Sequence, residues 1–435
     1  MACRLADIDA LCMPFYILSC LFAIKYVYFV RFIRANVRSF VISIHNKQKE
    51  MKKLNVNLAI ILFFIGGCTG CQQSGSQNDE IITVDVTASY PEKELILQDI
   101  MDVEYVPLET TDEFITHGIV EAVGKEFLLV RNRNDGNIFV FDRKTGKGLR
   151  KINRLGQGAE EYSGISGIIL DEDNNELFVV DYTKKILTYD LSGNFKRSFK
   201  FADNSHYDDV FDYDREHLIT YKKYYGTPEE NRQACHILFS KQDGSVTQEI
   251  PIPFKEMKTP VVMKDELVVT PEFHMTFPAK DHWVLVNTSS DTVYNYLPKG
   301  NLTPSIVRTP SIQSMEVEVF LFPTIITDRY YFMRTMKKEL DYKTFKGFPG
   351  TDLVYDKQEK AIFNYTICNA DYSNKKQVSF FSKPKNQEIP VSLSFEASDL
   401  TEAYEKGQLK GRLKEIAATL DEEANPVIML IKHKK

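Results

Sequence analysis

The sequence predicts an all-β fold, a six-bladed β-propeller whose blades are four-stranded antiparallel sheets, and three observations lead to it. A pattern of two short strands and a glycine turn occurs twice in succession. The second copy follows the first after about 50 residues, a period typical of propeller blades. The 29 Phe and 22 Tyr, against a single Trp, favour strands over helices. The two copies comprise 127–130, 138–142 and Gly146, then 177–180, 186–190 and Gly193.

The remaining segments supply the other blades in order. The run 81–86 alternates apolar and polar residues, as a half-buried strand does. Pro107 places the strand 103–108 at a sheet edge or a strand end. Looser copies use 217–221 and 237–240, then 266–270 and 291–296, then 329–333 and 352–365, and closing strands lie at 391–395 and 426–431. Five internal blades and one shared by the N- and C-terminal strands make six, which leaves no open edge at the seam.

A short helical insertion separates the last two strands. The segment 399–422 keeps its apolar residues at helical spacing, and Ser398 can cap its start. Gly407 and Gly411 are expected to split this helix.

The N-terminus carries two membrane-directed segments. Residues 11–30 are largely apolar and are followed by arginines, as in a membrane span. A basic 51–53 and an apolar 58–65 then form a signal peptide at 51–67, ending in small residues before Cys68. The simpler interpretation is that translation starts at Met51 and that 1–50 is an upstream misreading. The alternative is a true membrane segment at 1–50.

Residues 65–68, Ile-Gly-Gly-Cys, resemble the lipobox of bacterial lipoproteins. The resemblance implies that Cys68 receives a lipid after cleavage, with Cys71 as the alternative. Residues 68–80 begin the mature chain as a flexible polar tether, and 81–435 form the propeller.

The loop from Arg154 to Tyr162 and the strands at 177–193 look like the NHL-like six-bladed β-propeller lipoproteins of Gram-negative bacteria. Ala159 replaces the proline usual in that family's loop. The resemblance implies a propeller anchored to the outer membrane, periplasmic or surface-exposed, for which no general enzymatic activity is established.

The charge distribution argues against nucleic acid as a partner. The net charge is −6, and the first 67 residues carry +6, so the chain from Cys68 onward carries −12. Nucleic-acid-binding surfaces are basic, so we expect no nucleic-acid groove. The partners we expect are the membrane, through the N-terminal lipid, and a glycan or an envelope protein.

Five residues are candidates for ligand binding. Arg154, Gln157 and Tyr162 offer a donor, a two-way amide and a stacking surface on the loop that joins the two clear repeats. Propeller loops line the mouth of the central channel, where ligands bind. Asp181 and His274 complete the set, the latter with Glu272 two residues before it.

No cofactor, metal site or catalytic constellation is expected. The run 171–176 begins like a calcium loop but lacks its glycine, and the acidic cluster 203–214 has the composition of a solvated loop. The eight histidines show no pair at metal-binding spacing, and no Gly-x-Ser-x-Gly elbow occurs. Cys235 and Cys368 fall in strand-like runs, as buried free thiols or as a disulfide pair.

The leading hypothesis is a lipid-anchored, non-catalytic propeller that recognises a glycan, peptide or partner protein. A propeller hydrolase or lyase is the first alternative, and it predicts acidic and histidine side chains that converge at the central channel. A structural subunit of an envelope complex is the second, and it predicts an exposed apolar patch.

Overall fold

The computed structural model describes residues 81–201, 205–224, 234–264, 267–344 and 346–434. The predictions for 1–50, 51–67 and 68–80, including the lipid site, fall outside the described residues and stay predictions. Within the described residues, no helix is long and apolar enough to cross a membrane.

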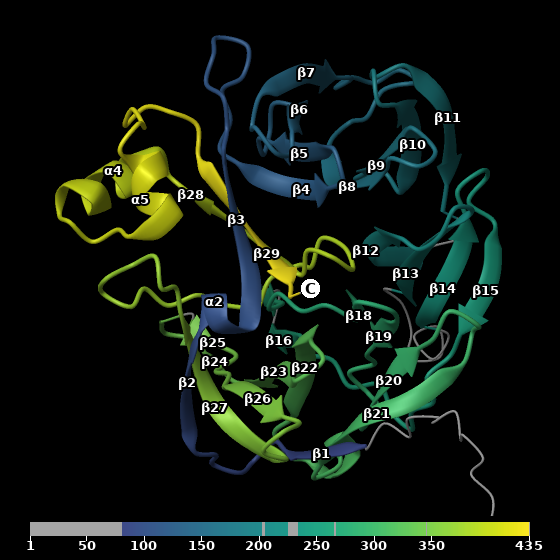
Figure 1. Ribbon diagram of the computed structural model, residues 1–435. Helices are drawn as coiled ribbons and strands as arrows, with labels where there is room; N and C mark the ends of the chain where they lie inside the picture. Colours follow the sequence, from purple (N-terminus) through teal and green to yellow (C-terminus); the bar gives the residue numbers. More distant parts are fainter. Residues whose placement is uncertain (1–80, 202–204, 225–233, 265–266, 345, 435) are drawn as a thin grey trace, which may run out of the picture. The chain divides into compact units, whose positions relative to one another are not determined.

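Six sheets form a ring of blades, which confirms the predicted six-bladed propeller (Figure 1). Three of these blades are four consecutive antiparallel strands. The first blade contains β4 (Ile119–Val123), β5 (Phe127–Arg131), β6 (Asn137–Asp142) and β7 (Gly148–Asn153). The second contains β8 (Ile165–Asp171), β9 (Glu176–Asp181), β10 (Lys185–Asp190) and β11 (Phe195–Lys200). The third contains β12 (Ser205–Asp212), β13 (His217–Tyr224), β14 (Cys235–Ser240) and β15 (Val246–Ile250).

The next two blades each gain a parallel fifth strand from the N-terminal part of the propeller. The fourth contains β18 (Thr276–Pro278), β19 (Trp283–Leu285), β20 (Thr292–Tyr296) and β21 (Leu302–Thr309), to which β1 (Ile82–Asp85) adds. The fifth contains β22 (Val319–Ile326), β23 (Tyr330–Lys337), β26 (Asp352–Asp356) and β27 (Ala361–Cys368), to which β2 (Glu92–Ile96) adds. The antiparallel strands follow the prediction except for the first strand of the fourth blade. The strand predicted at 81–86 forms as β1 but joins the fourth blade instead of the closing one, and β2 was not predicted.

The sixth blade closes the ring, as predicted, with strands from both ends of the chain. It contains β28 (Val391–Phe395), β29 (Val427–His433) and β3 (Met101–Pro107). β3 pairs with β29 along its whole length, from Met101 opposite His433 to Pro107 opposite Val427. A buried apolar cluster then joins this blade to the first, since Val106 and Ile428 pack with Leu128 and Phe141. Fully burying such a side chain stabilises the fold by about 1.5–3 kcal/mol.

The helical insertion also follows the prediction, except at its start. The helices α4 (Ala397–Glu405) and α5 (Gly411–Ala417) lie between β28 and β29 and are separated near Gly407. Ser398 does not cap them, because the N-cap is Glu396 and its side chain makes no capping hydrogen bond. The shorter elements are α2 (Leu97–Ile100), η1 (Ile312–Ser314), β24 (Leu340–Asp341) and β25 (Lys346–Gly347).

The prediction for the fourth blade was wrong in its first strand. The apolar run that begins at Leu267 forms β17 (Leu267–Val269), which pairs with β16 (Val262–Lys264) as a separate hairpin. The blade instead begins at β18, whose three residues are too few to show an alternating pattern. Cys235 and Cys368 are buried free thiols, so the disulfide alternative does not hold.

Candidate functional site

The loop between the first two blades holds its residues in structural contacts. The ring of Tyr162 is fully buried. Its hydroxyl donates to the carbonyl oxygen of Gly136 at 2.6 Å and accepts from the backbone N–H of Arg154 at 2.9 Å. The stacking surface expected from Tyr162 is therefore not available to a ligand.

Arg154 and Asp181 also hold the fold in place. Arg154 Nε donates to the carbonyl oxygen of Gly193 at 3.1 Å, which ties the loop to the turn of the second blade. Asp181 is buried and accepts from the backbone N–H groups of Ser163 at 2.6 Å and Thr183 at 2.7 Å. Burial acts to raise the pKa of Asp181, but these hydrogen bonds outweigh it and hold the pKa below its usual value. Arg154 and Gln157 are both exposed, and in the described part of the chain the Gln157 side chain makes no hydrogen bond that would occupy it.

A segment between the fifth blade and β28 runs through the channel, and we name residues 381–388 the channel segment. Lys385 Nζ donates to the carbonyl oxygen of Val120 at 2.8 Å, and Asn386 Nδ2 donates to that of Val123 at 2.5 Å. Lys383 Nζ lies 3.7 Å from Asp209 Oδ1. The segment thus contacts β4 and β12, and it helps to line two neighbouring cavities, which share Lys383.

The first cavity, the His274 chamber, has a volume of about 330 Å³. Asp209, Glu272, His274 and Lys383 meet there from three separate elements. His274 Nδ1 donates to Asp209 Oδ2 at 2.7 Å, and its Nε2 lies 3.5 Å from Glu272 Oε1. The other lining residues include Ser166, Tyr207, Asp208, Lys223 and Thr270.

A β-bulge directs Asp209 into this chamber. The pairing of β12 with β13 shifts between Asp208 and Phe211, and Asp209 takes a left-handed backbone conformation with φ +47°. Such strained bulges are common next to functional sites, where they re-aim a side chain. The preceding residue, Asp208, forms an ion pair with Lys223 of the neighbouring strand β13, with 2.5 Å between Lys223 Nζ and Asp208 Oδ2.

The electrostatics keep His274 protonated at neutral pH. Burial acts to lower its pKa, but the carboxylates of Asp209 and Glu272 outweigh burial and raise the pKa to about 9. Burial likewise acts to raise the pKa of Asp209, yet His274 and Lys383 hold it below its usual value. These four groups therefore supply two cations, His274 and Lys383, and two anions, Asp209 and Glu272, beside the Lys223–Asp208 ion pair that also lines the chamber.

This arrangement suits binding more than base catalysis. Both nitrogens of the His274 imidazolium face carboxylates, so the ring has no lone pair with which to accept a proton. In the described part of the chain, no hydroxyl or thiol hydrogen-bonds to the ring. The chamber can instead offer charged donors and acceptors to a polar ligand.

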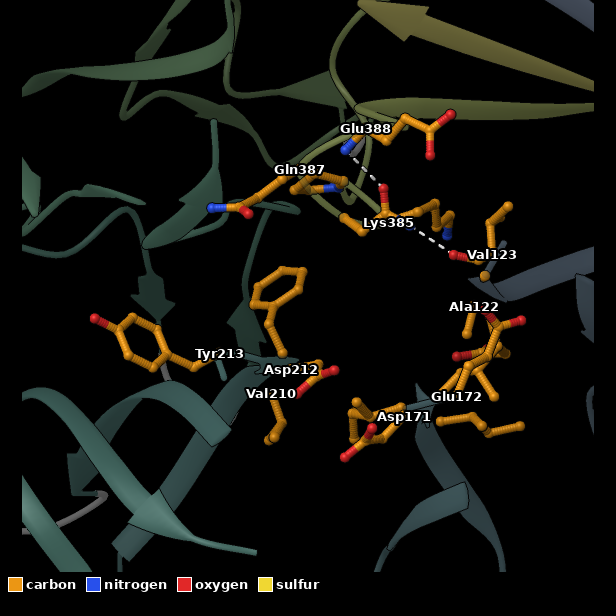
Figure 2. Close-up of a pocket in the computed structure, with 18 of the residues that line it drawn as sticks. Ala122, Val123, Asp171, Glu172, Val210, Asp212, Tyr213, Lys385, Gln387 and Glu388 are labelled. Carbon is orange, nitrogen blue, oxygen red and sulfur yellow. Dashed lines mark hydrogen bonds between the residues drawn. The ribbon is translucent and has the colours of Figure 1, made fainter. Parts of the chain in front are cut away.

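The second cavity, the Asp212 chamber, has a volume of about 380 Å³ and is lined by residues 383–388 of the channel segment (Figure 2). In Figure 2, Asp171, Glu172 and Asp212 lie across it from Lys385 and Gln387. The buried Lys241 forms ion pairs with Asp171 and, at 2.6 Å, with Asp212, and so joins the second blade to the third. Burial raises the pKa of Asp212 to about 6, against the opposing effect of Lys241.

Glu172 in the same chamber is committed to the fold. Its carboxylate accepts the backbone N–H groups of Lys125 at 2.6 Å, Glu126 at 3.0 Å and Phe127 at 2.9 Å. These bonds tie the first hairpin turn of one blade to that of the next. The run 171–176 is the hairpin turn expected from its Asp and Asn residues.

Sequence reasoning found His274 and its neighbour Glu272 but missed Asp209 and Lys383. The acidic cluster 203–214 was interpreted as a solvated loop, whereas much of it is β12, which lines the channel. The tyrosine, valine and phenylalanine in 207–211 could have indicated a strand, but the bulge at Asp209 breaks their alternation. The Lys-Pro-Lys run at 383–385 carried no signal of its position.

The fold and the site together define a class, a six-bladed β-propeller with a polar site in its central channel. The chain belongs to the family described as "6-bladed beta-propeller", which matches residues 72–390. A comparison with curated proteins gives no match.

Solved structures resemble the chain in fold. A crystal structure of a Bacteroides fragilis protein, classed provisionally as exported, is 14% identical with a TM-score of 0.54, and the match covers 82% of this chain and 100% of that one. Virginiamycin B lyase from Staphylococcus aureus is 10% identical with a TM-score of 0.34, over 77% of this chain and 100% of that one. BamB from Moraxella catarrhalis is 9% identical with a TM-score of 0.31, and the match covers 75% of this chain and 85% of that one. The first supports the fold alone, and the other two scores are too low to carry an argument.

Proposed function

We propose that this chain is a binding propeller of the cell envelope, anchored by a lipid on Cys68, which recognises a glycan or a peptide in the His274 chamber. One observation carries the proposal. Asp209, Glu272, His274 and Lys383 converge from separate elements on one cavity, with two charges of each sign. Perturbed titratable groups gathered in a cleft are characteristic of functional sites.

The ligand class follows from the groups that face the cavity. Lys383 and the His274 imidazolium attract carboxylate or carbonyl oxygens, and Glu272, whose side chain is 67% exposed, accepts from hydroxyl or amino groups. Glycans and peptides present both kinds of group. Their small terminal units also fit a cavity of about 330 Å³.

Arrays of glycans and peptides, probed with the purified full-length protein, test the proposal. We expect at least one family of related ligands to bind, with weaker binding in high salt because charged groups dominate the chamber. If no surface polymer or peptide binds above background, the proposed function is wrong.

The anchor has its own test, with a matched control. We expect wild-type protein to partition into the detergent phase of a Triton X-114 extraction, Cys68→Ala to lose this behaviour, and Cys71→Ala to keep it. Mass spectrometry of the N-terminal peptide checks that the lipid is on Cys68. Loss of partitioning in Cys71→Ala alone would move the anchor to Cys71.

A propeller lyase or hydrolase is the second candidate, favoured by the Asp209–His274 pair. An imidazolium whose pKa is about 9 can act as a general acid toward a bound leaving group. Incubating each array ligand with the protein and analysing the products by mass spectrometry separates the two functions. Fragments that disappear in His274→Gln would favour the enzyme, and intact ligand would favour the binding propeller.

A further inference from the structure

We infer that Lys385 is a nucleophilic amine that captures a small hydroxylated aldehyde in the Asp212 chamber as a Schiff base. The inference concerns the Asp212 chamber, which His274 does not line, and it does not rest on the proposed function. It starts from the position of the lysine, which lines the chamber together with Asp212 and Gln387 (Figure 2).

Lys385 differs from the neighbouring lysines in its partner. Its Nζ donates to the neutral carbonyl oxygen of Val120 at 2.8 Å. In the described part of the chain, no carboxylate lies within ion-pair distance of that nitrogen. Lys383 and Lys241, by contrast, each pair with an aspartate, Asp209 and Asp171 respectively. Burial removes water from the lysine side chain, and no carboxylate replaces the lost hydration. The charged ammonium form is therefore poorly stabilised.

The electrostatics agree with this position. Burial is the main cause that lowers the pKa of Lys385 to about 8. Glu121 acts in the opposite sense, Lys383 two residues away acts in the same sense as burial, and Asp209 and Glu272 oppose it more weakly. Desolvation and a second cation are two ways in which proteins activate a lysine for Schiff-base chemistry. At pH 7.5 about a quarter of such amines are neutral, whereas a lysine with the usual pKa of about 10.4 is about 0.1% neutral.

The chemistry needs no other reactant. The Nζ lone pair attacks the carbonyl carbon and forms the C–N bond, and the two amine hydrogens leave with the carbonyl oxygen as water. Protonation of the resulting imine gives a cation, on which Glu121, itself ion-paired with Arg131, exerts a favourable longer-range attraction. Asp212, whose side chain is 39% exposed, and Gln387 can bind the hydroxyl groups of the aldehyde.

Reductive trapping tests the inference. The full-length protein is incubated at pH 7.5 with glyceraldehyde and cyanoborohydride, which converts each imine into a stable secondary amine, and the modified lysines are mapped by mass spectrometry. We expect Lys385 to react on the order of ten times faster than Lys375 and Lys280, whose side chains are 64% and 56% exposed. Lys385→Arg should remove the fast site, and Lys375→Arg should leave it unchanged.

Two further outcomes decide the matter even if Lys385→Arg folds poorly. In the wild-type protein, the rate at Lys385 should level off above pH 8, whereas the rates at the exposed lysines should still rise. Labelling that follows exposure, with Lys385 slower than Lys375, would overturn the inference. A rate at Lys385 that still rises steeply above pH 9 would overturn it as well.

Discussion

Gly146→Ala is expected to destabilise the propeller far more than Gly300→Ala, although both glycines occupy the same turn in different blades. Both have a left-handed backbone, with φ +72° and +80°. A Cβ on Gly146 would lie 1.9 Å from the carbonyl oxygen of Pro107, in β3 of the closing blade. A Cβ on Gly300 would meet nothing closer than 3.7 Å.

The comparison of these two variants measures how much the pairing of β3 with β29, which closes the ring of blades, contributes to stability. The left-handed conformation costs alanine about 1–2 kcal/mol at either position. At Gly146 the clash with backbone also displaces β3, so we expect a total loss of about 3 kcal/mol or more. Thermal unfolding followed by circular dichroism measures both variants. Equal midpoints for Gly146→Ala and Gly300→Ala would show that the β3–β29 seam does not limit stability.

Raising the pH from 6.5 to 9 is expected to remove the stabilisation that His274 supplies. Its pKa is about 9 in the folded chain and about 6.5 in an unfolded chain. Because the folded state binds the proton more tightly, the contribution is fully present below pH 6.5 and is lost as the pH rises through 9. The difference corresponds to on the order of 3 kcal/mol.

Denaturant unfolding of the wild type and of His274→Gln at several pH values measures this contribution. The difference in unfolding free energy between the two proteins should shrink between pH 6.5 and 9. The other titrating groups are the same in both proteins, so their contributions drop out of this difference. His282→Gln is the matched control, because the carboxylate partner of that histidine, Asp281, is 84% exposed. A wild-type advantage over His274→Gln that does not change with pH would contradict the ion pair with Asp209.

Most of the fold could be predicted from the sequence because the strands of a propeller blade are close together along the chain. Each blade is a run of consecutive hairpins, so the strands and turning glycines, such as Gly146 and Gly193, repeat along the chain. What escaped prediction depends on distant pairing. The parallel strands β1 and β2 reach their blades across more than two hundred residues, and β18 is too short to show a pattern.

The site was less accessible for the same reason. His274 was identified as a candidate, but Asp209 lies 65 residues before it and reaches it only through a bulge. Arg154, Tyr162 and Asp181 were chosen for their residue types. The structure gives them backbone partners, since their hydrogen-bonding groups hold a tight turn together.

The most direct test of the channel site compares two substitutions with the ligand selected from the arrays. Binding is measured by titration calorimetry for His274→Gln in the chamber and for Gln157→Ala on the exposed loop. Glu272→Gln is included because the Glu272 side chain is 67% exposed, so this variant is expected to fold even if His274→Gln does not. We predict that His274→Gln and Glu272→Gln weaken binding by about tenfold or more, as loss of a charged hydrogen bond does, and that Gln157→Ala binds like the wild type. Binding that is lost in Gln157→Ala and retained in both chamber variants would contradict recognition in the channel.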